Sequence, residues 1–150
     1  LAQTTIGYPD HSAELEMLVD RDRLDPLESV RAVVEPADVA AISAMVAGVH
    51  LAPAVRGYLV GLVRATRTIS GVSLGASPRA ALHLARAAKA SAAMEGRNFV
   101  IPDDVASLAV PVLAHRLLLA PAGSSAGKTT ARELIETLVQ VSAKPRGESH

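Results

Sequence analysis

Arg79, His83 and Arg86 are spaced so that they fall within about 60° of one another on one face of a helix. That helix is predicted to begin at Pro78, so Arg79 lies in its first turn, where backbone N–H groups lack partners and the helix dipole is positive. A guanidinium is unfavourable there unless an anion lies beside it, because the helix end and the arginine then bind the same negative group. Two interpretations of Arg79 stay open: an exposed arginine that pairs with Asp10 or a neighbouring carboxylate, or a contact to a bound phosphate.

Residues 122–129 read AGSSAGKT and match a relaxed phosphate-loop pattern. A phosphate loop requires a parallel sheet and a later strand that ends in an acid to hold magnesium. Only twenty-one residues follow Thr129, none of them forms an apolar run ending in Asp, and the first glycine of the strict pattern is absent. A loop followed by a threonine that caps a helix explains this stretch better.

The histidines have no spacing typical of a metal site, either among themselves or with acidic residues. They are His11, His50, His83, His115 and His150. Asp103 and Asp104 are better explained as charges that favour a helix N-terminus than as a metal pair. A serine-rich loop is present, but it has no nucleophile elbow. The sequence therefore indicates no self-contained active site.

The composition favours one helical domain. The chain has 150 residues, of which 49% are hydrophobic and only 2% aromatic, so it is neither disordered nor rich in large core side chains. Alanine, leucine and valine dominate and favour closely packed helices. No apolar run is long enough to span a bilayer, and there is no cysteine for a disulfide, a thiol nucleophile or a Cys-based metal site. We expect an all-α fold, a small helical bundle with at most very short extended segments.

Apolar residues at helical spacing and capping signals predict six helices. The predicted helices begin near Asp10 or Ser12, at Pro36, Pro53 and Pro78, near Ile101, and at Thr129 or Thr130. Gly48 and Gly96 are expected to end the second and fourth helices, and Pro111 to bend or end the fifth. The residues expected to face inward are Leu15, Leu18, Val19, Val39, Ile42, Val46, Val55, Leu59, Leu62, Val63, Thr66, Ala81, Leu84, Ala85, Ala88, Ala92, Leu134, Leu138 and Val141.

The segments between these helices are expected to be extended or irregular. Residues 1–9 and the short pieces at 49–51 and 98–100 favour extended backbone, and residues 31–34 favour a short edge strand. Residues 70–77 are expected to form a Gly/Ser loop. The tail from Lys144 is polar and expected to be disordered.

Charge is unevenly distributed along a chain of zero net charge. Residues 1–40 hold nine acidic residues against three arginines, and residues 54–100 hold seven bases against one acid, Glu95. Two explanations stay open: the oppositely charged segments pack together, or the basic stretch faces an anion such as a phosphate or nucleic acid.

Several motifs in series resemble the C-terminal lid of MoxR-type AAA+ ATPases over roughly residues 5–120. They read Ile6-Gly7-Tyr8-Pro9, Leu62-Val63-Arg64-Ala65-Thr66-Arg67, Gly75-Ala76-Ser77-Pro78-Arg79-Ala80, Gly96 through Val105, and Leu113-Ala114-His115-Arg116-Leu117. The loop at 120–128 departs from the family, which is usually more acidic there. The resemblance implies a helical lid that closes over ATP bound by a separate α/β domain.

The resemblance also implies roles for individual residues. Arg79 matches the sensor-two arginine of AAA+ proteins, which reaches the γ-phosphate, and Tyr8 and Pro9 match a hinge that borders the adenine. Residues 1–9 would then be a linker from an ATPase core that precedes Leu1, residues 10–143 the lid, and residues 144–150 a disordered tail. ATP and magnesium would bind only in the full-length protein, and this fragment alone would be inactive.

The family relationship further implies a homo-oligomeric ring in the cytoplasm, with a chaperone-like role on partners that carry von Willebrand factor A domains. No membrane association is expected. The alternative is a helical module without an ATPase role, which binds nucleic acid through residues 54–100 or binds another protein. Zero net charge and only three lysines disfavour nucleic acid as a partner.

Overall fold

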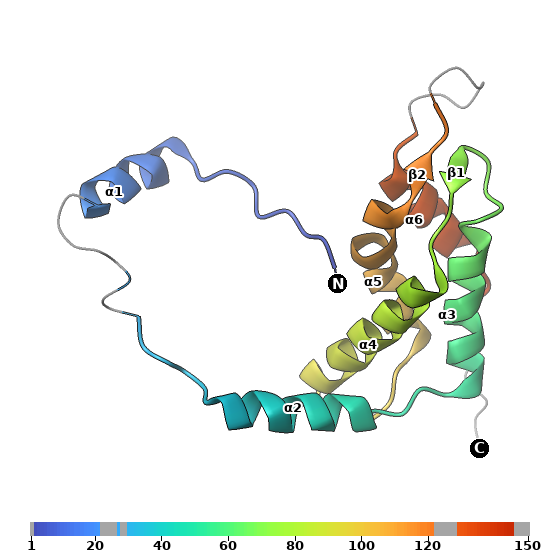
Figure 1. The fold of residues 1–150 in the computed structure, drawn as a ribbon, viewed down its shortest axis with the longest axis horizontal. Coiled ribbons are helices and arrows are strands. Elements are labelled where there is room, and N and C mark those ends of the chain that lie inside the picture. The colour runs from blue at the N-terminus through green and yellow to red at the C-terminus, as the bar shows by residue number, and fades with distance from the viewer. Residues whose placement is uncertain (1, 22–26, 28–29, 122–128, 146–150) are drawn as a thin grey trace. The chain divides into compact units, whose positions relative to one another are not determined.

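A computed structural model describes residues 2–21, 27, 30–121 and 129–145 (Figure 1). The chain divides into two compact units, one of residues Thr4–Ile42 and the other of Leu1–Gln3 with Ser43–His150. We refer to them as the N-terminal unit and the main unit, and each is described by itself.

The N-terminal unit contains helix α1 (His11–Arg21) and the beginning of helix α2 (Pro36–Gly48). Of the two residues expected to cap α1, Asp10 is the cap: its carboxylate accepts hydrogen bonds from the Ser12 hydroxyl at 2.8 Å and the Ala13 N–H at 2.9 Å. These bonds lower the pKa of Asp10. At α2, the Asp38 carboxylate accepts a hydrogen bond from the Glu35 N–H at 2.9 Å.

Two predictions for this region are wrong. Residues 31–34 form no strand, because the described residues offer them no neighbouring strand for pairing. The apolar faces expected to be buried in α1 and α2 are largely exposed: Leu15, Leu18, Val19, Val39 and Ile42 are each at least half exposed, and Val46 is partly buried. The sequence identified these residues correctly as apolar, but within the N-terminal unit no described residue buries them.

The main unit is a helical bundle. It comprises the end of α2, helices α3 (Pro53–Ala65), α4 (Pro78–Met94) and α5 (Pro102–Leu113), the short 3-10 helix η2 (Ala114–Arg116), and helix α6 (Ala131–Val141). Helix α4 packs against α5 and α3, and α5 packs against α6 (Figure 1). All five residues expected to face inward from the third helix are buried: Val55, Leu59, Leu62, Val63 and Thr66.

Helix α4 matches its sequence-based prediction closely. Leu84, Ala88 and Ala92 are completely buried on one face, whereas Ala81 and Ala85, which were expected on the same face, are only partly buried. The small alanine side chains let α4 approach its neighbours closely. Gly96 ends the helix with a φ of 73°, and the N–H of Arg97 donates to the carbonyl of Ala92 at 2.8 Å. This is the left-handed helix end that favours glycine.

The extended segments are short, and one of them was predicted to be a loop. Within residues 70–77, strand β1 (Val72–Leu74) pairs antiparallel with strand β2 (Leu118–Leu119). The Ser73 hydroxyl donates to the carbonyl of Leu118 at 3.0 Å. The segments at 49–51 and 98–100, both expected to be extended, meet in a bridge between His50 and Phe99.

The end of the bundle differs in detail from the prediction. Helix α5 continues through Pro111 to Leu113. Thr130 caps α6 by accepting from the Glu133 N–H at 3.2 Å, while Glu133 accepts from the Thr130 N–H at 2.8 Å. In α6, Leu138 is buried as expected, but Val141 is 74% exposed.

Val141 is exposed because the buried face of α6 is rotated relative to the predicted one. Ile135, rather than Leu134, is the fully buried residue of this helix. Beyond the helix, Lys144 pairs with the Asp103 carboxylate. None of the helices in the described part of the chain has the length and apolar character needed to cross a membrane. The expected fold class, an all-α bundle with very short extended segments, is confirmed.

Candidate functional site

Arg79 lies in the first turn of α4, one residue after Pro78 at the start of the helix, and its side chain is exposed. It makes no hydrogen bond or ion pair with any described residue of the main unit. Within this unit the described carboxylates therefore leave Arg79 unpaired. The guanidinium is available to an external ligand.

The helix end beside Arg79 lacks a side-chain cap. Ser77 occupies the predicted cap position with extended backbone, but its side chain makes no capping hydrogen bond. The first turn contains no acidic residue. An uncapped helix N-terminus and a guanidinium both attract negative charge, so this end of α4 suits an anion such as a phosphate group.

The segment before α4 is held by the side chains of Thr66 and Arg67, the two residues that follow α3. The buried Thr66 hydroxyl accepts a hydrogen bond from the Ala76 N–H at 2.9 Å and donates one to the Val63 carbonyl at 2.7 Å. The Arg67 Nε donates to the Ala76 carbonyl at 3.0 Å. Both backbone polar groups of Ala76 are thus held by residues 66 and 67, and we call this arrangement the Ala76 clamp.

Gly75 permits the clamp because the two segments approach very closely there. A Cβ at Gly75 would lie 2.6 Å from the Thr66 carbonyl oxygen and 2.7 Å from both the Cα and the backbone nitrogen of Arg67. These are backbone atoms, which cannot rotate away as a side chain can. Only glycine fits at this position without moving the chain.

The surroundings of Arg79 are positively charged. Burial lowers the pKa of His83, and the positive charges of Arg116, Arg86 and Arg79 lower it further. His83 is partly buried, and Arg86 is exposed. The lowered pKa favours the neutral form of His83, so the positive charge of this helix face comes mainly from the arginines.

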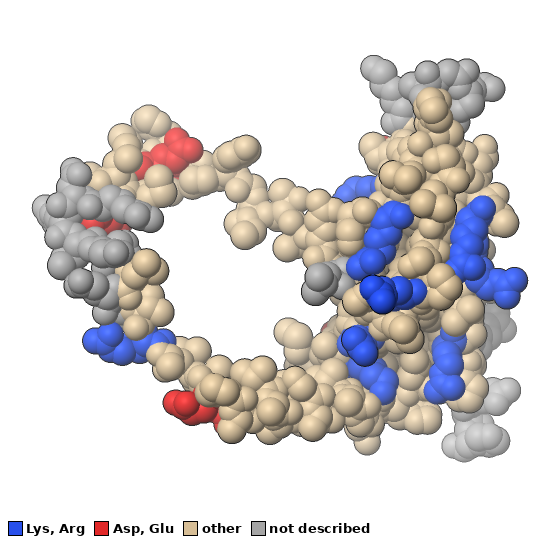
Figure 2. All heavy atoms as spheres, viewed as in Figure 1, with Lys and Arg blue, Asp and Glu red and all other residues tan. Residues whose placement is uncertain are grey.

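The charge imbalance seen in the sequence follows the division into units. Residues 4–42 carry nine acids and three arginines, and the rest of the chain carries twelve bases and six acids. Figure 2 shows Lys and Arg side chains spread over the visible face of the part of the main unit that contains α3 and α4, with almost no Asp or Glu among them. This face of the main unit favours anionic ligands.

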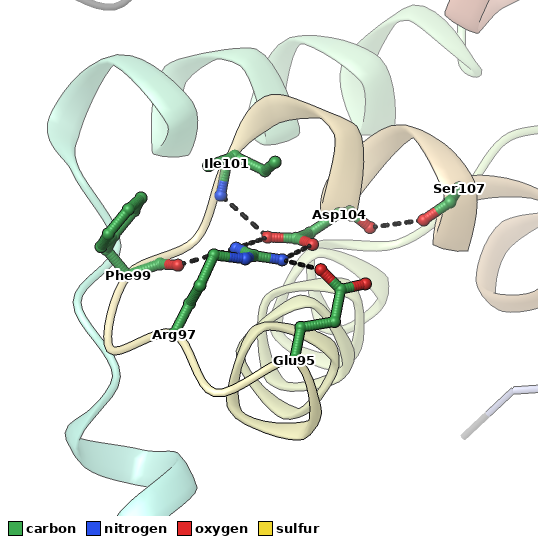
Figure 3. Close-up of polar contacts among 6 residues, drawn as sticks. All are labelled: Glu95, Arg97, Phe99, Ile101, Asp104 and Ser107. Carbon is green, nitrogen blue, oxygen red and sulfur yellow. Dashed lines mark hydrogen bonds and ion pairs between the residues drawn. The ribbon is translucent and has the colours of Figure 1, made fainter.

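An extensive polar network around Arg97 and Asp104 was not anticipated from the sequence. The Arg97 guanidinium donates to both carboxylate oxygens of Asp104, at 2.7 and 2.8 Å, and also to Glu95 and to the Phe99 carbonyl (Figure 3). Asp104 in addition accepts from the Ile101 N–H at 2.8 Å. The expected role of Asp104 at the helix N-terminus is correct, but it is also the buried partner of Arg97.

This network fixes the connection between α4 and α5. Burial raises the pKa of Asp104, but the hydrogen bonds from Arg97 and the Ile101 N–H outweigh burial, so the net pKa is lowered. The hydrogen bonds to Asp104 and Glu95 raise the pKa of Arg97. With all these groups paired, we interpret the network as structural rather than ligand-binding.

The remaining candidates are distributed as follows. Tyr8 and Pro9 lie in the N-terminal unit, before α1, and are exposed. Residues 122–128 of the phosphate-loop-like stretch lie outside the described residues. Among the residues that are described, no group of three or more His, Asp or Glu is arranged to hold a metal ion.

Comparison with known protein families identifies the family to which the main unit belongs. The family model of the AAA lid domain matches residues 64–138, a range that includes the Ala76 clamp, Arg79 and the Arg97–Asp104 network. This chain belongs to the AAA lid domain family. The predicted resemblance is thereby confirmed.

Relatives and a solved structure identify the type of lid. The chain is 41% identical to the protein MoxR of Paracoccus denitrificans over 88 residues and 32% identical to the chaperone MoxR1 of Mycobacterium tuberculosis over 128 residues. It superimposes with a TM-score of 0.82, at 28% identity and over 97% of its length, on the crystal structure of a candidate ATPase from Cytophaga hutchinsonii. The domain is a lid of the MoxR type of AAA+ ATPase.

The chain corresponds to only part of each of these proteins. The matches involve 50% and 79% of this chain, but 26% of the P. denitrificans protein and 33% of the M. tuberculosis protein. The aligned region is 46% of the C. hutchinsonii chain. An uncharacterised Bacillus subtilis protein, YeaC, is 35% identical over 121 residues, which are 81% of this chain and 38% of YeaC.

Proposed function

We propose that this lid senses the nucleotide in a full-length AAA+ ATPase, and that Arg79 contacts the γ-phosphate of ATP bound by a separate nucleotide-binding domain. The observation that carries the proposal is the exposed Arg79 guanidinium, which has no described partner in its unit and lies at an uncapped helix N-terminus. A terminal phosphate would interact with both positive features at once.

The residues of this chain fit one part of an ATP site. Arg79 offers a charged, bidentate donor for phosphate, but the described residues provide no cluster of acids for magnesium. We propose that magnesium and the rest of the ATP are held by the separate nucleotide-binding domain. ATP, when bound, supplies the phosphoanhydride bond whose hydrolysis removes the terminal phosphate that Arg79 contacts.

A contact that depends on the terminal phosphate makes the lid position depend on the nucleotide. With ATP bound, Arg79 favours the closed lid, and after hydrolysis this contribution is lost. Gly7, with a φ of 83°, precedes Tyr8 and Pro9. We propose that residues 7–9 form the hinge and that the exposed Tyr8 ring and Pro9 border the adenine.

The family relationship supports a larger assembly. We propose a homo-oligomeric ring in the cytoplasm that couples hydrolysis to the chaperone-like maturation of other proteins. Partners with von Willebrand factor A domains are proposed on the family resemblance. The name of the M. tuberculosis relative, chaperone MoxR1, agrees with such a role.

Substitution of Arg79 in the full-length protein tests the proposal. Arg79→Ala should lower ATP turnover by at least about tenfold, because a charged group that stabilises the reacting phosphate is lost. Arg86→Ala is the matched control: it removes an exposed arginine from the same helix and should have little effect. Unchanged turnover in Arg79→Ala would overturn the proposal. The 150-residue chain alone should release no phosphate from ATP.

The positive face of the main unit is the observation that favours a second function, nucleic-acid binding. Such binding would weaken steeply as salt is raised, since each phosphate contact releases counterions. DNA and RNA titrations of this chain at several salt concentrations distinguish the two functions. We expect no salt-dependent binding.

A further inference from the structure

Two motifs that are separate in the sequence, residues 62–67 and residues 75–80, contact each other in the structure. Thr66 and Arg67 end the first motif, and Gly75 and Ala76 begin the second, yet they meet in the Ala76 clamp. Thr66 is completely buried, and Ala76 is 1% exposed. Hydrogen bonds in such a dry environment are costly to leave unmade, so the clamp holds Ala76 firmly.

Little conformational freedom lies between the clamp and Arg79. Only Ser77 and Pro78 intervene, and the proline ring restricts its own φ and keeps Ser77 extended. Ala80 is completely buried and attaches the other side of the first turn to the core. The position of the Arg79 backbone is therefore determined by the end of α3 as well as by α4 itself.

The absence of a side-chain cap makes the clamp more important. A serine at the N-cap position of a helix typically accepts a hydrogen bond from a backbone N–H of the first turn through its side-chain oxygen. This bond fixes the residue at which the helix begins. The Ser77 side chain makes no such bond here. The Ala76 clamp holds the chain one residue earlier and takes over that structural role.

We propose that Thr66 and Arg67 are positioning residues for Arg79. Through the backbone of Ala76, they hold the first turn of α4 where the guanidinium can reach the terminal phosphate. They also join α3 to Arg79, so that a force on the guanidinium moves both helices together. This inference depends on the proposed function of Arg79.

Thr66→Val in the full-length ATPase is the central test. Valine keeps the shape of threonine but removes the hydroxyl that accepts the Ala76 N–H. We expect kcat for ATP to fall by about three- to tenfold, because a small displacement of a catalytic contact has a large effect on rate. Thr66→Ser, which restores the hydroxyl, should recover most of the activity.

A double variant separates positioning from a general loss of structure. In the Arg79→Ala background, Thr66→Val should change kcat by less than about twofold, since no guanidinium remains to be positioned. A merely structural role would lower kcat by the same factor in both backgrounds, and that result would overturn the proposal. So would an unchanged kcat in Thr66→Val alone.

Arg67→Met provides a second test that leaves no buried donor unpaired. It keeps the aliphatic stem of an exposed residue and removes the Nε that holds the Ala76 carbonyl. We expect a two- to fivefold loss of kcat, about the effect of one displaced contact. Arg64→Met is its control, because Arg64 is also exposed near the end of α3 but makes no contact with Ala76.

Thr68→Val is the control for the threonine, because the Thr68 hydroxyl donates only to the Ala65 carbonyl at the exposed end of α3. Arg79→Ala itself tells the two proposals apart. If Arg79→Ala leaves turnover unchanged, the function proposed for Arg79 fails. If it lowers turnover but Thr66→Val and Arg67→Met do not, only the positioning role fails.

Discussion

The charged side chains of Asp104 and Arg79 differ in burial and in pairing. The Asp104 side chain is 5% exposed and receives two hydrogen bonds from Arg97, whereas Arg79 is exposed and has no described partner in its unit. A buried charge must be paired to be tolerated, and an exposed one need not be. The Asp104 charge therefore contributes to the fold, and the Arg79 charge remains available to a ligand.

Asp104→Asn should destabilise the domain by about 1.5–3 kcal/mol, the contribution typical of charge-assisted hydrogen bonds. Asn keeps the size of the side chain and an oxygen for the Ile101 N–H, but it loses the charge that faces Arg97. Urea unfolding of this chain measures the effect. Asp103→Asn is the matched control: it removes an exposed carboxylate that pairs only with exposed Lys144, and it should change stability little.

The same carboxylate predicts a dependence on pH. The pKa of Asp104 is lower in the folded state than in the unfolded state, so its contribution is complete above the unfolded pKa of about 3.9 and is lost as pH falls further. Urea unfolding between pH 2 and 7 should show a smaller acid-induced loss of stability in Asp104→Asn than in the unchanged chain. Equal losses would contradict the assignment.

At the scale of elements, glycines in and after α3 have opposite structural roles. Gly61 lies within α3, is exposed, and has nothing within 4 Å of an added Cβ, whereas a Cβ at Gly75 would collide with the backbone at Thr66 and Arg67. The first glycine weakens a helix that alanine would strengthen. The second allows α3 and the start of α4 to meet.

Substitution by alanine should therefore have opposite effects at these two glycines. Gly61→Ala is expected to stabilise the chain by about 0.5–1 kcal/mol, the difference in helix propensity between the two residues. Gly75→Ala should destabilise it by at least about 1 kcal/mol, because the backbone must move. Thermal or urea unfolding of both variants measures these changes in stability. A Gly75→Ala variant that is more stable than the unchanged chain would contradict the close approach between Gly75 and the backbone of Thr66 and Arg67.

At the scale of the whole molecule, burial is confined to one part of the chain. Every buried residue among those described lies between Val49 and Leu138, within the main unit. The helices of the N-terminal unit carry apolar residues that remain exposed, such as Leu18 and Ile42. The main unit therefore contains the hydrophobic core on which cooperative unfolding depends.

A chain that begins at Ser43 should fold on its own. We expect its thermal midpoint to lie within about 3 °C of the full 150-residue chain, because no buried residue is removed. A chain that ends before Thr129 is the contrasting control, since it loses Ile135 and Leu138 from the core. Circular dichroism melts compare them. Equal destabilisation by both truncations would show that the N-terminal segment belongs to the folding unit.

The sequence by itself determined the helices of the main unit, the alanine face of α4 and the place of Arg79 in its first turn. These features depend on residues close together in the chain: Pro78 starts the helix, Gly96 ends it, and apolar spacing shows which side is buried. The motifs around Arg79 also led to the correct family.

Only the tertiary structure decided how distant segments meet. The pairing of β1 with β2, the hydrogen bonds from Thr66 and Arg67 to Ala76, and the partnership of Arg97 with Asp104 all depend on the path of the chain in three dimensions. Likewise, apolar spacing in α1 and α2 could not reveal that these faces are uncovered here. Local propensity specifies an element and its apolar side, but the partner of each side chain is determined by packing between elements.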